Sequence, residues 1–172
     1  MSKVCCSNNR VEKSLLEQCR LDGGISLTIF ISKSEEDLVL GKIGANRKED
    51  CKKAYRIVLQ GKKIYSENYK RMKKRHCHTV LCQDAVMFTI KYFIQNIITG
   101  RIYAVGHRVG LKEIVHHFDD VGYHIINTEM TMDTEVVSAD LIREELFVMK
   151  IHGTSDSYVC RVPNLYGQSV IK

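Results

Sequence analysis

The fold prediction rests on residues 101–126, which read RIYAVGHRVGLKEIVHHFDDVGYHII. The pattern predicts a strand over residues 101–105, a turn over residues 106–110 and a second strand over residues 123–126. Between the turn and the second strand, apolar residues recur at i, i+3, i+4 and i+7, which indicates an amphipathic helix on Leu111, Ile114, Val115 and Phe118. A strand, a helix and a strand in succession form a βαβ unit, whose strands lie parallel in one sheet.

The segments on either side extend this pattern. Residues 84–98 carry apolar side chains on nearly all sides, which predicts a buried helix that ends at Gly100. Residues 139–146 predict a further helix, and residues 148–151 predict a strand after it. Both halves of the pattern therefore favour helices packed on a sheet.

The first part of the chain is less regular. The spacing of Val11, Leu15 and Cys19 predicts a helix that begins after Asn9 and ends at residues 22–24, and residues 25–31 read as a strand. Residues 34–37 predict a solvated turn or a helix start, and residues 51–59 predict a short helix. We expect a single α/β domain over residues 1–172, with an incomplete, Rossmann-like and partly parallel sheet flanked by helices. Residues 24–78 are then a divergent or basic insertion within it.

Composition excludes several classes of protein. The chain has 172 residues, of which 44% are apolar and 27% charged, with one Pro and no Trp, as expected for one soluble globular domain. No segment has the roughly 18 consecutive apolar residues of a membrane-spanning helix, so we expect no membrane span. The first residues lack the apolar core of a signal peptide. Seven cysteines at irregular spacing indicate mostly free thiols in a reducing compartment, cytoplasmic or nuclear.

The net charge of +6 is unevenly distributed along the sequence. Residues 62–75 contain seven basic residues against the single acid Glu67, and the rest of the chain is formally neutral. Such a run is often a solvated face, but it also fits a surface that contacts phosphates, with Tyr65 and Tyr69 available for stacking on bases. The candidate nucleic-acid-binding residues are Lys62, Lys63, Lys70, Arg71, Lys73, Lys74 and Arg75.

A second candidate site lies near the N-terminus. Ser7, Asn8 and Asn9 follow a short apolar segment and precede the expected helix. Their side chains, the free backbone N–H groups and the helix dipole would together bind an anion such as phosphate. The alternative is that these residues only cap the helix.

Three other motifs are weaker. The cluster of His76, Cys77, His78 and Cys82 has zinc-ligating groups, but no second ligand pair accompanies it, so we expect no metal site. Residues 106–110 are similar to a glycine-rich phosphate-binding turn but lack its third glycine, which favours a simple tight turn. Neighbouring side chains on a helix diverge by about 100°, so His116 and His117 do not share one metal ion and are expected on the surface.

Two separated segments resemble the p-nitrophenylphosphatase and phosphoglycolate phosphatase branch of the haloacid dehalogenase superfamily. Residues 3–23 are similar to the family's strand ending in Thr/Ser-Asn-Asn and the helix after it, and residues 79–126 are similar to its passage from core helix to strand to helix. The resemblance implies a Rossmann-like fold and hydrolysis of phosphate monoesters through an aspartyl-phosphate, with magnesium as cofactor. It implies that Ser7 holds a phosphoryl oxygen, while Asn8 and Asn9 shape the loop.

The sequence departs from the family at the catalytic residues. Only six residues precede Ser7, so the strand that carries the family's Asp-x-Asp-Gly nucleophile is expected to be missing. The partial echo at Asp22 and Gly23 follows the Ser-Asn-Asn turn, and Arg20 stands in place of the nucleophile. The resemblance therefore implies a catalytically impaired relative, a pseudoenzyme that binds a phosphorylated small molecule or a partner. The alternative is a basic module that binds nucleic acid or an acidic protein through residues 62–75.

Overall fold

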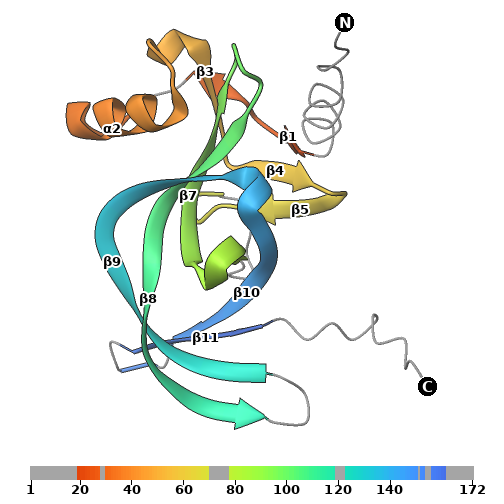
Figure 1. The fold of residues 1–172 in the computed structure, drawn as a ribbon, viewed down its shortest axis with the longest axis vertical. Coiled ribbons are helices and arrows are strands. Elements are labelled where there is room, and N and C mark those ends of the chain that lie inside the picture. The colour runs from red at the N-terminus through yellow and green to blue at the C-terminus, as the bar shows by residue number, and fades with distance from the viewer. Residues whose placement is uncertain are drawn as a thin grey trace, which may run out of the picture.

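The computed structural model describes residues 19–27, 30–69, 78–118, 123–150, 152–153 and 156–161. Its secondary structure is predominantly antiparallel β, as Figure 1 shows. The strands are β1 (Cys19–Leu21), β2 (Ser26–Leu27), β3 (Cys51–Ala54), β4 (Arg56–Leu59), β5 (Lys62–Tyr65), β6 (Thr79–Cys82), β7 (Met87–Asn96), β8 (Ile102–Phe118), β9 (Tyr123–Ser138), β10 (Ile142–Lys150) and β11 (Ser157–Arg161). The helices are α2 (Lys33–Ile43) and three short 3₁₀ turns, Lys48–Asp50, Gln83–Ala85 and Ala139–Leu141.

Six strands form a closed sheet. Their order is β7, β6, β10, β11, β9 and β8, and the pairing of β8 with β7 completes the ring. Every described pairing in the ring is antiparallel. In Figure 1, β8 and β9 are the long curved strands that run side by side around the ring. Strand β3 pairs with residues 93–96, the C-terminal part of β7, and β2 pairs with β3, so these two strands extend the sheet outside the ring.

A second, three-stranded sheet packs against the ring. Its order is β1, β4 and β5, also antiparallel. Ile57 and Ile64 of this sheet share one buried apolar cluster with Phe88, Ile90 and Phe93 of β7. The small sheet is therefore anchored by its apolar face, and β5 is an edge strand whose one partner among the described strands is β4.

Two further clusters complete the core. One joins α2, through Val39 and Ile43, to Tyr92 and Ile94 of β7. The other draws residues from all six strands of the ring: Leu81, Met87, Val109, Ile126, Leu146, Val148 and Val159. Burial of these side chains supplies most of the stability of such a small sheet protein.

The α/β prediction is wrong. The predicted βαβ unit is the antiparallel β8–β9 pair: residues 106–110 continue β8 rather than turning, and residues 111–118 are strand rather than helix. The helices predicted over residues 84–98, 51–59 and 139–146 are also mainly strand. The haloacid dehalogenase-like sheet with parallel strands and flanking helices is therefore not the fold of this chain.

Several predicted strands are confirmed. Residues 101–105 lie almost entirely in β8, residues 123–126 begin β9, and residues 148–150 end β10. The predicted helix start at residues 34–37 falls in α2, whose N-cap is Ser32. Residues 24–78, expected as an insertion, contain β2, α2, β3, β4 and β5. The expected N-terminal helix lies outside the described residues up to residue 18, and its last residues form strand β1 rather than helix.

Candidate functional site

The sequence-predicted candidates fall unevenly on the described residues. Ser7, Asn8 and Asn9 lie outside them, so the phosphate-binding prediction stays a prediction. Lys62 and Lys63 lie on the edge strand β5, and both are exposed. The remaining basic candidates lie outside the described residues: Lys70, Arg71, Lys73, Lys74 and Arg75.

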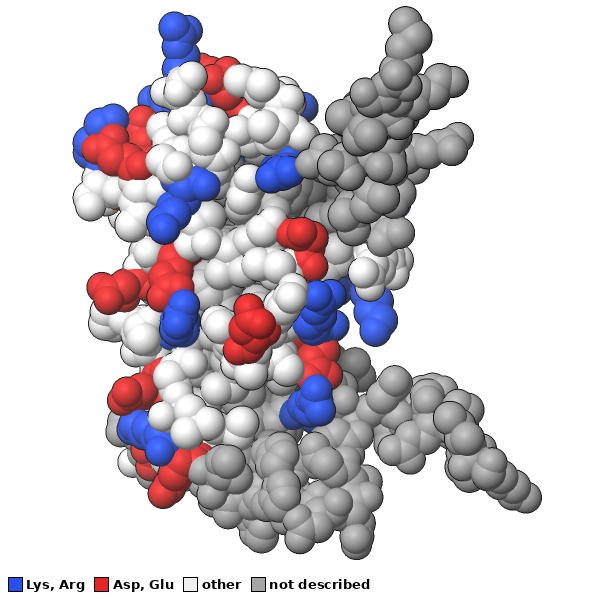
Figure 2. All heavy atoms as spheres, viewed as in Figure 1, with Lys and Arg blue, Asp and Glu red and all other residues white. Residues whose placement is uncertain are grey.

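The described residues are nearly neutral. They contain 17 Lys and Arg and 16 Asp and Glu, a difference of +1. On the face that Figure 2 shows, basic and acidic side chains are interspersed rather than gathered by sign. The sequence's excess of positive charge therefore lies mostly outside the described residues, and residues 70–75 alone carry five basic side chains and no acidic one.

The residues that directly precede this basic segment in the sequence help to line a cavity of about 810 Å³. It is lined by three short stretches: residues 22–24 after β1, Tyr55 and Arg56 at the junction of β3 and β4, and residues 67–69 after β5. Its size is in the usual range of small-molecule sites, about 300 to 1,000 Å³. The antiparallel pairing of β1 with β4 and of β4 with β5 brings these stretches together.

Arg56 organises the cavity. Its Nε atom lies 2.8 Å from the Oδ2 atom of Asp22 as an ion pair, and its Nη1 atom donates a 2.9 Å hydrogen bond to the Tyr69 hydroxyl oxygen. The backbone N–H of Asp22 also donates to the Arg56 carbonyl, at 3.0 Å. Gly23 has a φ of +88°, and a Cβ atom there would lie 3.3 Å from Arg56 Nη2. The turn after β1 therefore suits a glycine for both conformation and space.

Aromatic rings surround the same guanidinium. Its central carbon lies 5.3 Å from the ring centroid of Tyr69 and 5.9 Å from that of Tyr65. The two rings lie 5.1 Å apart, with their planes tilted by 49°. The sequence prediction singled out both tyrosines for stacking, and the structure brings them together around Arg56. These cation–π contacts add to the attraction from Asp22.

Two polar side chains at the cavity are not engaged. Glu67 and Asn68 are exposed, and neither makes a side-chain hydrogen bond or ion pair with the residues described. Sequence reasoning did not identify this site, because Asp22, Arg56 and Glu67 come from separate segments with no motif spacing. The only local signal was the pair of tyrosines beside the charge run.

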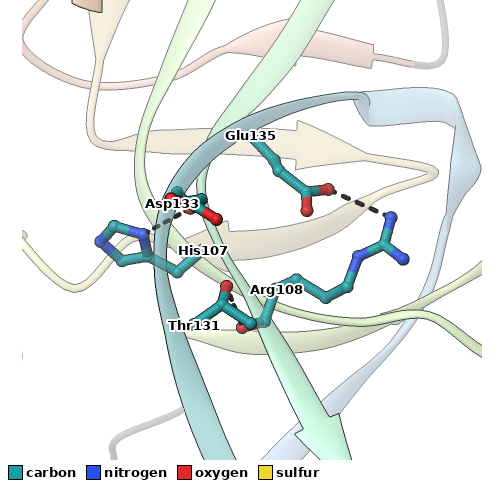
Figure 3. A network of polar contacts seen from close by, with 5 residues as sticks. All are labelled: His107, Arg108, Thr131, Asp133 and Glu135. Carbon is teal, nitrogen blue, oxygen red and sulfur yellow. Dashed lines mark hydrogen bonds and ion pairs between the residues drawn. The ribbon is translucent and has the colours of Figure 1, made fainter.

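A second polar network crosses the β8–β9 pair, and Figure 3 shows it. His107 Nδ1 lies 2.9 Å from the Asp133 carbonyl oxygen, and the Thr131 hydroxyl donates to the Arg108 carbonyl at 2.9 Å. Arg108 Nη2 pairs with Glu135 Oε2 at 3.1 Å. The register shifts at this point, where β9 contributes two extra residues. The network thus satisfies polar groups at a bulge, and we assign it to strand pairing rather than to chemistry.

The thiols and the zinc-ligating residue types weighed in the sequence form no joint site in the described structure. His76 and Cys77 lie outside the described residues, while Cys82 is buried between the ring and the small sheet. Burial raises the pKa of the Cys82 thiol to about 11. Across the described part of the chain, no three His, Cys, Asp or Glu side chains group as metal ligands, and all four cysteines there are free.

Comparison with known proteins gave no match: no family model, no curated protein and no solved structure matches the chain. Within the described ranges, no helix has the length and hydropathy needed to cross a membrane. The cavity around Arg56 and the basic stretch beside it are therefore judged on their own chemistry.

Proposed function

We propose that this protein is a binding module for single-stranded nucleic acid and that residues 62–75 supply its phosphate-contacting side chains. The observation that carries the proposal is the concentration of basic charge: seven basic residues in this stretch, against a difference of only +1 over all the described residues. Lysine and arginine side chains that contact phosphates release counterions, which drives binding without sequence preference.

The local structure supports this choice over a merely solvated charge run. Lys62 and Lys63 are exposed on β5, an edge strand that no neighbour covers among the described residues. Tyr65 ends that strand, and Tyr69 lines the cavity. Proteins that bind single-stranded nucleic acids combine basic side chains with aromatic side chains on which the bases stack. The fold implied by the phosphatase resemblance is not present, so we propose the alternative, a basic module that binds its partner through residues 62–75.

The test is a salt titration of binding. The full chain is titrated into a fluorescein-labelled single-stranded 12-mer, and anisotropy gives the affinity from about 50 to about 200 mM salt. Each phosphate contact contributes a slope of about −0.7 in log K against log salt, so seven contacts predict a slope of about −5. The triple variant Lys73→Gln, Lys74→Gln, Arg75→Gln should make the slope less negative by about 2.

A matched triple variant controls for net charge. Lys42, Lys48 and Lys52 are exposed and lie on or near α2 and β3, away from β5. Changing all three to Gln removes the same charge, and it should leave most of the slope intact. No binding at the lowest salt, or equal slopes for the two triple variants, would contradict the proposal. Binding of polyglutamate but not of the oligonucleotide would replace nucleic acid with an acidic protein as the partner.

A further inference from the structure

The cavity around Arg56 is placed to accept a base of a single-stranded nucleic acid whose phosphates contact the basic stretch, residues 62–75. Tyr69 lines it, and the next residue in the sequence is Lys70, the first of the five basic residues in 70–75. A phosphate bound near Lys70 would therefore carry its base within reach of the cavity. The volume of about 810 Å³ leaves room for a base with its sugar.

The charges of the cavity exclude the phosphate itself. Among the described residues that line it, Arg56 is the one cation, and the 2.8 Å contact with Asp22 neutralises it. Glu67 adds a negative charge with no counterpart among the described residues. Because the described part of the lining is acidic by one charge, it disfavours an anion, and a neutral group that offers N–H donors fits it better.

The same lining offers planar surfaces. Tyr55, Arg56 and Tyr69 line the cavity, and the ring of Tyr65, which is not among the lining residues, lies 5.9 Å from the central carbon of the Arg56 guanidinium. Aromatic faces and guanidinium planes both stack on bases. A flat heterocycle therefore fits better than an aliphatic ligand.

The unengaged polar groups select among the bases. The carboxylate of Glu67 accepts two adjacent hydrogen bonds, and of the four bases only guanine presents two adjacent N–H donors on its Watson–Crick edge, at N1 and N2. Asn68 and the Arg56 Nη2 atom supply donors for the O6 and N7 acceptors. We propose that this cavity binds guanine, with Glu67 as its specificity-determining residue. The inference rests on the proposed function, because it names the base that the same site reads.

The first experiment uses nucleosides, which carry no phosphate. Guanosine, adenosine, cytidine and uridine are each titrated into the full chain, and binding is followed by saturation-transfer NMR. Guanosine should bind at least tenfold more tightly than the other three. Glu67→Gln should weaken guanosine tenfold or more, because an amide cannot accept both N–H donors. Glu129→Gln changes an exposed carboxylate on β9 and should have no effect.

Four outcomes separate the two proposals. Equal binding of all nucleosides, or guanosine binding unchanged by Glu67→Gln, overturns the guanine site. If the chain binds an all-thymidine 12-mer and the same 12-mer with one guanosine equally, the guanine site falls and the nucleic-acid function stands. If guanosine binds in a Glu67-dependent way but no oligonucleotide binds, the nucleic-acid function falls and the guanine site stands. Preference for the guanosine-containing strand, lost in Glu67→Gln, supports both.

Discussion

The Tyr92 hydroxyl donates a 2.8 Å hydrogen bond to the Oε1 atom of Glu35. Tyr92 is a fully buried residue of β7, and Glu35 lies in the first turn of α2. The other oxygen of the same carboxylate accepts the Ile31 backbone N–H at 2.7 Å. The Nζ atom of Lys53 lies 3.8 Å from the centre of the Tyr92 ring. The Glu35 carboxylate therefore holds the start of α2 and also attaches the helix to strand β7.

Removing the Tyr92 hydroxyl should loosen this attachment. We expect Tyr92→Phe to lower the free energy of unfolding by about 1.5 to 3 kcal/mol. The bond has a charged acceptor, and its loss leaves the half-buried Glu35 Oε1 atom without this donor. Urea unfolding measures the change. Glu35→Gln keeps a hydrogen-bond acceptor at the same place and should cost less. If Tyr92→Phe unfolds at the same urea concentration as the parent protein, the bond has no role in stability.

Asn96 should be the most sensitive polar position in the core. Its side chain is fully buried, donates to the Ile43 carbonyl at 3.1 Å and accepts the backbone N–H groups of Ile98 and Thr99. Asn96→Leu leaves these groups without partners, and we expect a loss of about 2 to 4 kcal/mol in the free energy of unfolding. Asn96→Asp keeps the acceptor but not the donor, so it should fall between the two proteins in a thermal melt. An unchanged melting temperature for Asn96→Leu would contradict this role.

Two glycines of β8 form a matched pair. A Cβ atom on Gly106 would lie 1.9 Å from the Thr89 carbonyl oxygen, which is backbone and cannot move without breaking the β7–β8 pairing. On Gly110 the nearest atom is Cγ of the flexible Glu129 side chain, at 3.2 Å. We expect Gly106→Ala to lose about 3 kcal/mol or more and Gly110→Ala to lose less than about 1 kcal/mol. Equal melting temperatures for the two variants would contradict the close approach of β7 and β8.

Alkaline pH should destabilise the protein through its buried thiols. Burial raises the pKa of Cys82 to about 11, and burial with the nearby Asp140 charge does the same for Cys19, whereas the ordinary value is 9.0. Because the folded pKa is the higher one, the thiols stabilise the fold fully below pH 9, and this stabilisation is lost as the pH rises through 11. Urea unfolding should show the decline over that window, with a shallower slope in the double variant Cys19→Ala, Cys82→Ala. The same slope in both proteins would contradict it.

Strand β7 shows why the fold class was predicted wrongly. Apolar residues on all sides of a segment indicate either a buried helix or a strand that is covered on both faces, and periodicity cannot separate the two. Phe88, Ile90 and Phe93 face the small sheet, while Tyr92 and Ile94 face α2. The β-branched and aromatic composition of this segment was the signal that favoured a strand.

The wrong prediction of a helix over residues 111–118 has a different cause. The β8–β9 register shifts between Leu111 and Glu113 and again between Ile114 and His116, and each shift adds one residue to β8. Each extra residue interrupts the alternation of the two faces, so this part of β8 lacks the period of two that marks a strand in the sequence. Bulges depend on the partner strand, so the pattern of β8 alone could not reveal them. The candidate site was equally hidden, because Asp22 and Arg56 meet only after β1 and β4 pair.

Strand β11 completes the ring and is the last of the described strands in the chain. It lies between β10 and β9 and follows both in the chain, so neither of those strands has its final neighbour until Ser157–Arg161 is available. During synthesis the earlier strands leave the ribosome with exposed edges, and these edges are where chains pair wrongly with one another. A chain that lacks β11 would therefore leave the edges of β9 and β10 open to wrong pairing, and β11 protects both of them.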